Sequence, residues 1–121
     1  MCGIVGITST DDSVSDTLSG LQALEYRGYD SAGIACSNDN NLHYQKSIGK
    51  ISNLIHQLNN KQFEGKTTIA HTRWATHGRP HHLNAHPFVK ANCALVHNGI
   101  IENYDELISS FSVDRNNLES E

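Results

Sequence analysis

MCGIVGI, residues 1–7, decides how the chain begins to fold, because an apolar run starts almost at the first residue. The polar residues Thr8, Ser9 and Thr10 follow it at once. A short apolar run with a polar boundary is typical of a buried β-strand, and the sequence predicts one over residues 3–7. We therefore expect the amino terminus to lie inside the protein rather than to form a loose tail.

Outward from this strand, apolar residues recur in two patterns. Spacings of three and four residues predict amphipathic helices within residues 14–24, 51–58 and 101–111. Short runs of β-branched and small apolar residues predict strands at 32–36, 42–45, 67–72 and 93–97, of which the first two form a hairpin. Helices and strands do not alternate strictly, which predicts an α+β fold with a largely antiparallel sheet. The long polar loop at 74–91 is the segment in which we expect function.

The length, composition and net charge of the chain limit which classes of function are possible. A chain of 121 residues falls in the range of one domain, and 37% hydrophobic with 18% charged residues indicates a globular protein rather than a disordered one. A net charge of −4 provides no basic field to attract phosphate backbones, so we expect no nucleic-acid partner.

The first residues and the cysteines predict the cellular compartment. Asp11 and Asp12 interrupt the chain before a signal peptide could form, and no stretch approaches the ~18 apolar residues of a membrane span. Three cysteines without a CxxC pair do not form a secreted disulfide framework. We expect a cytoplasmic protein without membrane contact.

Cys2 is the first candidate for chemistry, because a methionine followed by a small residue is a substrate for removal of the initiator. Loss of Met1 would leave the Cys2 thiol beside a free α-amine, whose ordinary pKa of roughly 7.7 to 8.0 suits a general base. The amine could then activate the thiol as a nucleophile without a histidine. Alternatively, Cys2 is a packed thiol, as we expect for Cys36 and Cys93, which lie in apolar runs.

Arg73 and Trp74 stand where a predicted strand runs out into the long loop. The planar fork of a guanidinium binds a carboxylate through two hydrogen bonds, so Arg73 is a candidate for the α-carboxylate of an amino acid, with Trp74 covering the site. The alternative is a surface arginine beside a core tryptophan.

Asn98 and Gly99 follow the last predicted strand and precede a helix. A side-chain N–H of Asn98 and the main-chain N–H of Gly99 can form an oxyanion hole, in which each donor typically contributes ~3 kcal/mol. The alternative is that the pair forms only a tight turn.

Four histidines crowd the loop, but Gly78 and Pro80 prevent helical presentation of metal ligands, and acidic or thiol ligands are missing there. We therefore expect neither a metal site nor a cofactor. The histidines are His77, His81, His82 and His86.

Together these segments resemble the class II glutamine amidotransferases. The resemblance rests on MCGIVG at 1–6, LEYRGYDSAG at 24–33, HTRWATHG at 71–78, NAHP at 84–87 and VHNGIIEN at 96–103. The YRGYD and WATH runs favour the branch that makes glucosamine 6-phosphate from fructose 6-phosphate. The resemblance implies the four-layer αββα sandwich of N-terminal nucleophile hydrolases, with Cys2 at the end of a central strand.

The resemblance also implies a role for each matching residue. Cys2 attacks the side-chain amide of L-glutamine, and Asn98 with Gly99 forms the oxyanion hole. The substrate-binding residues that it implies are Arg73 for the α-carboxylate, Thr76 and His77 nearby, Trp74 as a gate for ammonia, and Arg27 and His86 as organisers of the site.

The chain departs from the family in length. Residues 1–121 match the amino-terminal half of the glutaminase domain, so we expect a truncated sandwich without the sugar isomerase modules through which the family uses fructose 6-phosphate. The family's Ser-Glu-Thr-Asp segment, whose aspartate binds the α-amino group of glutamine, would begin at Ser120 and Glu121. We expect weak activity from these residues alone and a homo-oligomer for the full-length enzyme.

Two alternative functions remain open for the chain. They are a non-catalytic glutamine-binding fragment and an amidophosphoribosyltransferase-type glutaminase.

Overall fold

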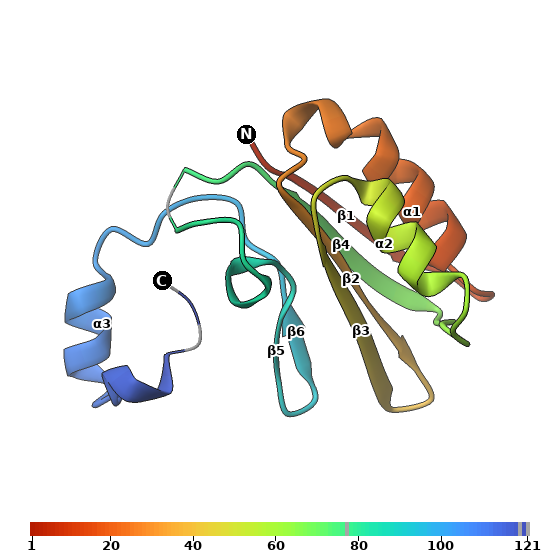
Figure 1. Cartoon of the computed structure of the whole chain (residues 1–121). Helices are drawn as coiled ribbons and strands as arrows, with labels where there is room; N and C mark the ends of the chain where they lie inside the picture. The colour runs from red at the N-terminus through yellow and green to blue at the C-terminus, as the bar shows by residue number, and fades with distance from the viewer. Residues whose placement is uncertain (77, 119, 121) are drawn as a thin grey trace.

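A computed structural model describes residues 1–76, 78–118 and 120. Its centre is a four-stranded sheet in the order β1-β4-β2-β3, with every neighbouring pair antiparallel. The helices α1 and α2 cover one face, and the hairpin of β5 and β6 lies on the other side (Figure 1). The bounds of the six strands are β1 Gly3–Thr8, β2 Ser31–Asn38, β3 Asn41–Ile48, β4 Thr67–Arg73, β5 Phe88–Lys90 and β6 Cys93–Leu95.

The first strand forms where the sequence predicts it, but it lies at the edge of the sheet. Gly3 is buried, whereas Ile4, Gly6 and Thr8 are exposed. Because an edge strand has a partner on one side only, the expectation of a buried strand is wrong for most of its length. Met1 is 75% exposed, so the expected interior position of the terminus begins only at Cys2, which is half-buried.

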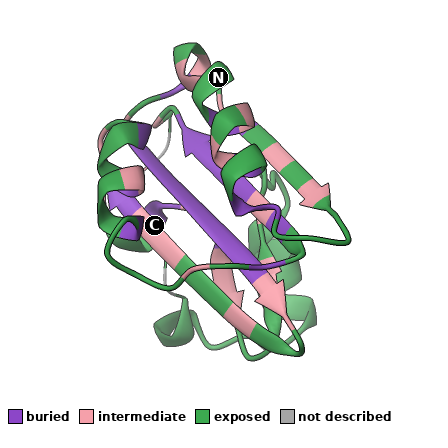
Figure 2. Ribbon diagram, turned by 90° about the vertical axis from the view of Figure 1, so that its right-hand side faces the viewer, coloured by how far each residue is buried: buried purple, intermediate pink, exposed green. Residues whose placement is uncertain are grey.

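The hydrophobic core lies between the sheet and the two helices, α1 (Val14–Ala23) and α2 (Ile51–Leu58). The helices form because their apolar residues recur at helical spacing and face the sheet. Figure 2 shows buried residues on the strands beneath them. Fully buried side chains from both layers meet there, among them Leu21, Ile34, Ile51 and Leu54.

The predicted hairpin is longer than expected, because its turn is shorter. Asp39 and Asn40 alone form the turn, with φ angles of 47° and 69°. Asn and Asp tolerate this left-handed backbone, which matches the twist of a two-residue hairpin. The polar residues on either side therefore belong to the strands.

The segment expected to be one long loop contains regular structure. A 3-10 turn spans His82–Asn84, and β5 pairs with β6 through Lys90 and Cys93. Cys93 is exposed on this short hairpin, so the expectation of a buried thiol is wrong for Cys93, while Cys36 is 1% exposed as expected.

The last helix, α3, spans Tyr104–Ser110, within the range predicted for it. It is set apart from the sheet in Figure 1. Within the described part of the chain, no helix is long and apolar enough to cross a membrane.

Candidate active site

The central strand β4 presents two different surfaces. Thr68 bonds through its hydroxyl to Ser13 and Thr17 at α1, and Ala70 belongs to the helix-side core. Since side chains alternate along a strand, His71 and Arg73 project from the opposite face. That face is the one toward β5 and β6 (Figure 1), and the candidate site is built on it.

Cys2 lies at one end of this sheet. Gly3 pairs with Thr72, so the next register position brings Cys2 beside Arg73. The backbone N–H of Trp74 donates to Cys2 Sγ at 3.4 Å, and the Cys2 thiol lies 3.8 Å from the Trp74 carbonyl oxygen, to which it donates. Arg27 Nε donates to the Cys2 carbonyl at 3.2 Å, so Arg27 contacts the backbone of the candidate nucleophile.

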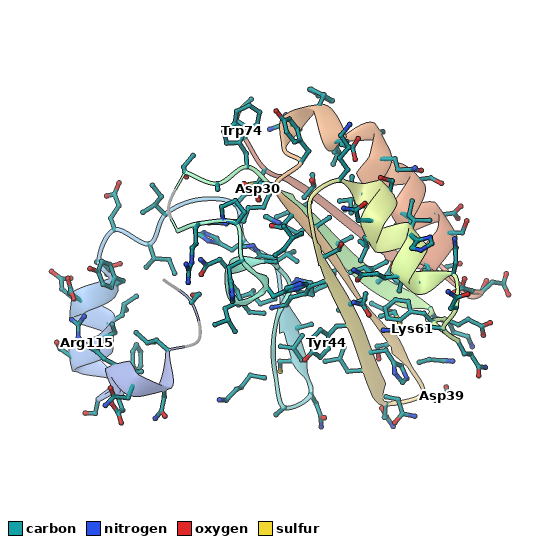
Figure 3. The ribbon with its side chains drawn as sticks, viewed as in Figure 1. Asp30, Asp39, Tyr44, Lys61, Trp74 and Arg115 are labelled. Carbon is teal, nitrogen blue, oxygen red and sulfur yellow. The ribbon has the colours of Figure 1, made fainter. Side chains whose placement is uncertain are left out.

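The loop after β4 is fixed to the start of β2. Asp30 Oδ2 accepts the backbone N–H of Ala75, and the Asp30 N–H donates to the Arg73 carbonyl at 3.1 Å. Trp74 and Asp30 lie together near the amino terminus in Figure 3. Trp74 is 47% exposed and its ring meets Tyr29 edge to face at 5.9 Å, so it can cover an adjacent site.

Arg73 is 8% exposed, which excludes the alternative of a surface arginine. Its guanidinium donates to the carbonyls of Gly78 at 3.2 Å and Arg79 at 3.3 Å. The positive charge therefore lies under the loop that carries the predicted substrate residue Thr76, which is exposed. His77, predicted for the same role, lies outside the described residues.

The predicted oxyanion pair is exposed and follows β6. Asn98 Oδ1 lies 2.8 Å from His71 Nε2. Because Oδ1 can only accept, a proton on His71 Nε2 completes this hydrogen bond and leaves the Asn98 NH2 group to donate elsewhere. Gly99 has a φ of 141°, a backbone region that favours glycine.

His86 packs between two rings, with centroids 4.2 Å from His71 and 4.4 Å from Phe88. Burial, followed by the positive charges of His71 and Arg73, lowers the pKa of His86 to about 3. His86 is therefore neutral near pH 7, and its role as an organiser stays a prediction. Among residues 1–76, 78–118 and 120, no group of three or more potential ligands is arranged to hold a metal ion.

The sequence does not predict two of the site residues, His71 and Asp30. Both act through partners distant in the chain, Asn98 and Ala75. His71 carried one local signal, because it shares a strand face with Arg73 at a spacing of two.

Curated proteins of one kind are similar to this chain in sequence. The glutamine–fructose-6-phosphate aminotransferases (isomerizing) of Helicobacter pylori and Wigglesworthia glossinidia brevipalpis are 56% and 54% identical over 108 and 112 residues, which is 88% and 90% of this chain. The Staphylococcus aureus enzyme is 52% identical over 88% of the chain. The chain spans 18% of the length of each of these relatives. No family model matches.

Two solved structures of another type of enzyme share the fold. The glutamine phosphoribosylpyrophosphate amidotransferase of B. subtilis, complexed with ADP and GMP, matches with a TM-score of 0.75, and an allosteric regulatory enzyme of purine biosynthesis matches with 0.80. Each is 28% identical and is matched over 93% of this chain and 25% of its own.

The fold is that of an N-terminal nucleophile glutaminase domain, as the resemblance implied, with only part of the four-layer sandwich present in these 121 residues. Its sequence is homologous to the amino-terminal region of the glutamine–fructose-6-phosphate aminotransferases.

Proposed function

We propose that this chain hydrolyses L-glutamine to glutamate as the glutaminase part of an enzyme that transfers the ammonia to fructose 6-phosphate, forming glucosamine 6-phosphate. The observation that carries the proposal is the position of Cys2, whose sulfur accepts the Trp74 N–H at 3.4 Å beside Arg73. The identity of 52–56% to aminotransferases of that name supports the acceptor. The enzyme would work in the cytoplasm, and its full-length form would be a homo-oligomer.

Removal of Met1 must precede the reaction. Its 75% exposed position makes it accessible to an aminopeptidase, and its loss converts the Cys2 nitrogen from an amide into a basic amine. The amine takes the thiol proton as Cys2 Sγ attacks the side-chain carbonyl carbon of glutamine. The Asn98 NH2 group and the Gly99 N–H stabilise the oxyanion of the tetrahedral intermediate.

The intermediate collapses when the C–N bond breaks and the ammonium form of the Cys2 amine protonates the departing amide nitrogen, which leaves as ammonia. This leaves a glutamyl thioester on Cys2, and water then attacks the thioester carbonyl to release glutamate and restore the thiol. Arg73, buried under the Thr76 loop, draws the α-carboxylate of glutamine to the site. Trp74 screens the departing ammonia from solvent.

Two other functions compete with this proposal. A non-catalytic glutamine-binding fragment would retain binding and release no glutamate. An amidophosphoribosyltransferase-type glutaminase shares the fold, but the structures of that type are 28% identical, far below the 52–56% of the fructose 6-phosphate enzymes.

The test uses protein expressed from the complete reading frame that encodes these residues. We expect glutamate release from glutamine, Cys2 as the first residue by mass spectrometry, and loss of activity to background in Cys2→Ala. Cys93→Ala is the matched control, because this exposed thiol lies on the β5–β6 hairpin and should be dispensable. Activity of Cys2→Ala near that of the control, or full activity with Met1 retained, would refute the proposed chemistry.

A further inference from the structure

Asn98 is an exposed residue with an amide that has two opposite ends. One orientation presents NH2 to the oxyanion of the proposed reaction, and the other presents a carbonyl oxygen that would repel it. Exposure means that packing does not select between them. A specific hydrogen bond is therefore required to hold the productive orientation, and the 2.8 Å contact from His71 Nε2 to Asn98 Oδ1 provides one.

His71 is itself held rigidly. It lies on β4, the strand between β1 and β2, where its backbone pairs with Ile4 on one side and Gly33 on the other. Its side chain is 1% exposed, and the ring of His86 lies 4.2 Å away. An imidazole fixed in this way has little freedom to follow Asn98 if the amide turns.

The surroundings of His71 also select one protonation state. Burial lowers the pKa of His71, and the charge of Arg73 opposes a second proton, while the Asn98 bond, the His97 backbone and Asp30 act in the other direction. His71 Nδ1 is buried and has no hydrogen-bond partner among the described residues. A proton there would be unsatisfied, whereas a proton on Nε2 meets Asn98 Oδ1, so the neutral Nε2–H tautomer is favoured.

We propose that His71 is a positioning residue for glutamine hydrolysis, because its Nε2–H binds Asn98 Oδ1 and turns the Asn98 NH2 group toward the oxyanion formed at Cys2. The proposal rests on the proposed function and adds to it a residue that acts through Asn98 alone. In this role His71 acts through its hydrogen bond to Asn98, and its contribution appears when charge develops on the substrate oxygen.

The experiment compares two substitutions of nearly equal size in the complete protein. His71→Gln keeps an N–H donor close to the position of Nε2, and His71→Met removes it. Loss of one oxyanion donor costs ~10²- to 10³-fold in kcat, and loss of its orientation costs part of that. We expect kcat for glutamine hydrolysis to fall at least about 10-fold in His71→Met with KM changed by less than about threefold, and His71→Gln to recover most of kcat.

A double-mutant cycle separates positioning from a structural role. Once Asn98→Ala has removed the amide, His71→Met should cause no further loss, because the two residues act as a unit. The rate of Cys2 alkylation by iodoacetamide, a displacement without an oxyanion, should be the same in wild type and His71→Met. Losses that multiply, or a parallel loss of alkylation, would show that His71 supports the fold and would overturn the proposal.

Measurements on the wild-type protein test the proposal even if the variants fail to fold. Nitrogen-15 NMR should show neutral His71 with its proton on Nε2, and a proton on Nδ1 would overturn the proposal whatever the variants do. If wild type released no glutamate at all, the proposed function would fail instead. Wild-type activity together with an unchanged kcat in His71→Met would refute the positioning role alone.

Discussion

Gly28 offers a sharp test of how closely the site depends on backbone packing. A Cβ atom added at Gly28 would lie 2.6 Å from the carbonyl carbon of Arg73, 2.7 Å from the nitrogen of Trp74 and 2.8 Å from the Arg73 oxygen. Ordinary contacts of a Cβ begin at 3.4 Å, so the Arg73–Trp74 peptide would have to move by about 0.6 to 0.8 Å. Gly28 has an extended φ of 177°, so the cost of Gly28→Ala is steric.

The displaced peptide is the one whose N–H donates to Cys2 Sγ, and therefore both stability and activity should respond. Overpacking of this kind costs ~1 to 3 kcal/mol, and a displacement near 1 Å at a reacting group costs up to ~10²-fold in rate. We expect Gly28→Ala to lower kcat/KM for glutamine by 10- to 100-fold and to lower the urea midpoint of unfolding.

Gly6→Ala is the matched control, because an added Cβ at this position on β1 meets its nearest atoms at 3.9 Å. Its stability should stay within about 0.5 kcal/mol of wild type, and its activity should be unchanged. If Gly28→Ala behaved like Gly6→Ala in both assays, the close approach of Gly28 to Arg73 and Trp74 would not control the site.

The remaining predictions concern binding, thiol reactivity and pH. Arg73→Ala should raise KM for glutamine strongly through loss of the carboxylate contact, and an unchanged KM in steady-state kinetics would remove Arg73 from substrate binding. Burial raises the pKa of the Cys36 thiol to about 11, so a disulfide reagent at pH 8 should label exposed Cys93 quickly and Cys36 only after unfolding. The unfolded chain takes up a proton at His86 as pH falls through 6.5, whereas the folded pKa is about 3, so the free energy of unfolding should decrease as pH falls below 6.5. Urea titrations from pH 7 to pH 4 should show a smaller decrease in His86→Gln, and an equal decrease in both proteins would contradict the prediction.

Local patterns in the sequence were sufficient for most elements of the fold, and the differences have local causes. The β2–β3 hairpin is predicted by its apolar runs, but its turn is shorter because Asp39 and Asn40 accept positive φ angles. The strand β5 is three residues long and carries no readable period. Cys93 lies in an apolar run, yet it is exposed because β6 belongs to a sheet of only two short strands.

Local patterns likewise predict some residues of the candidate site and not others. Cys2, Arg73 and Asn98 stand out in the sequence because each belongs to a residue pattern with its own chemistry. His71 and Asp30 do not, since their roles depend on partners 27 and 45 positions away in the chain. Such pairs become visible only when the sheet register is known.

The register of β1 against β4 controls both the core and the chemistry. With Gly3 opposite Thr72, the helix-side face of β4 contributes Ala70 and Thr72, and the other face contributes His71 and Arg73 beside Cys2. A slip of one residue in β4 would turn each side chain to the opposite face and bury the Arg73 charge in the apolar core. The hydrophobic effect therefore selects the same register that places the nucleophile beside the arginine, and the site is assembled by the forces that form the core.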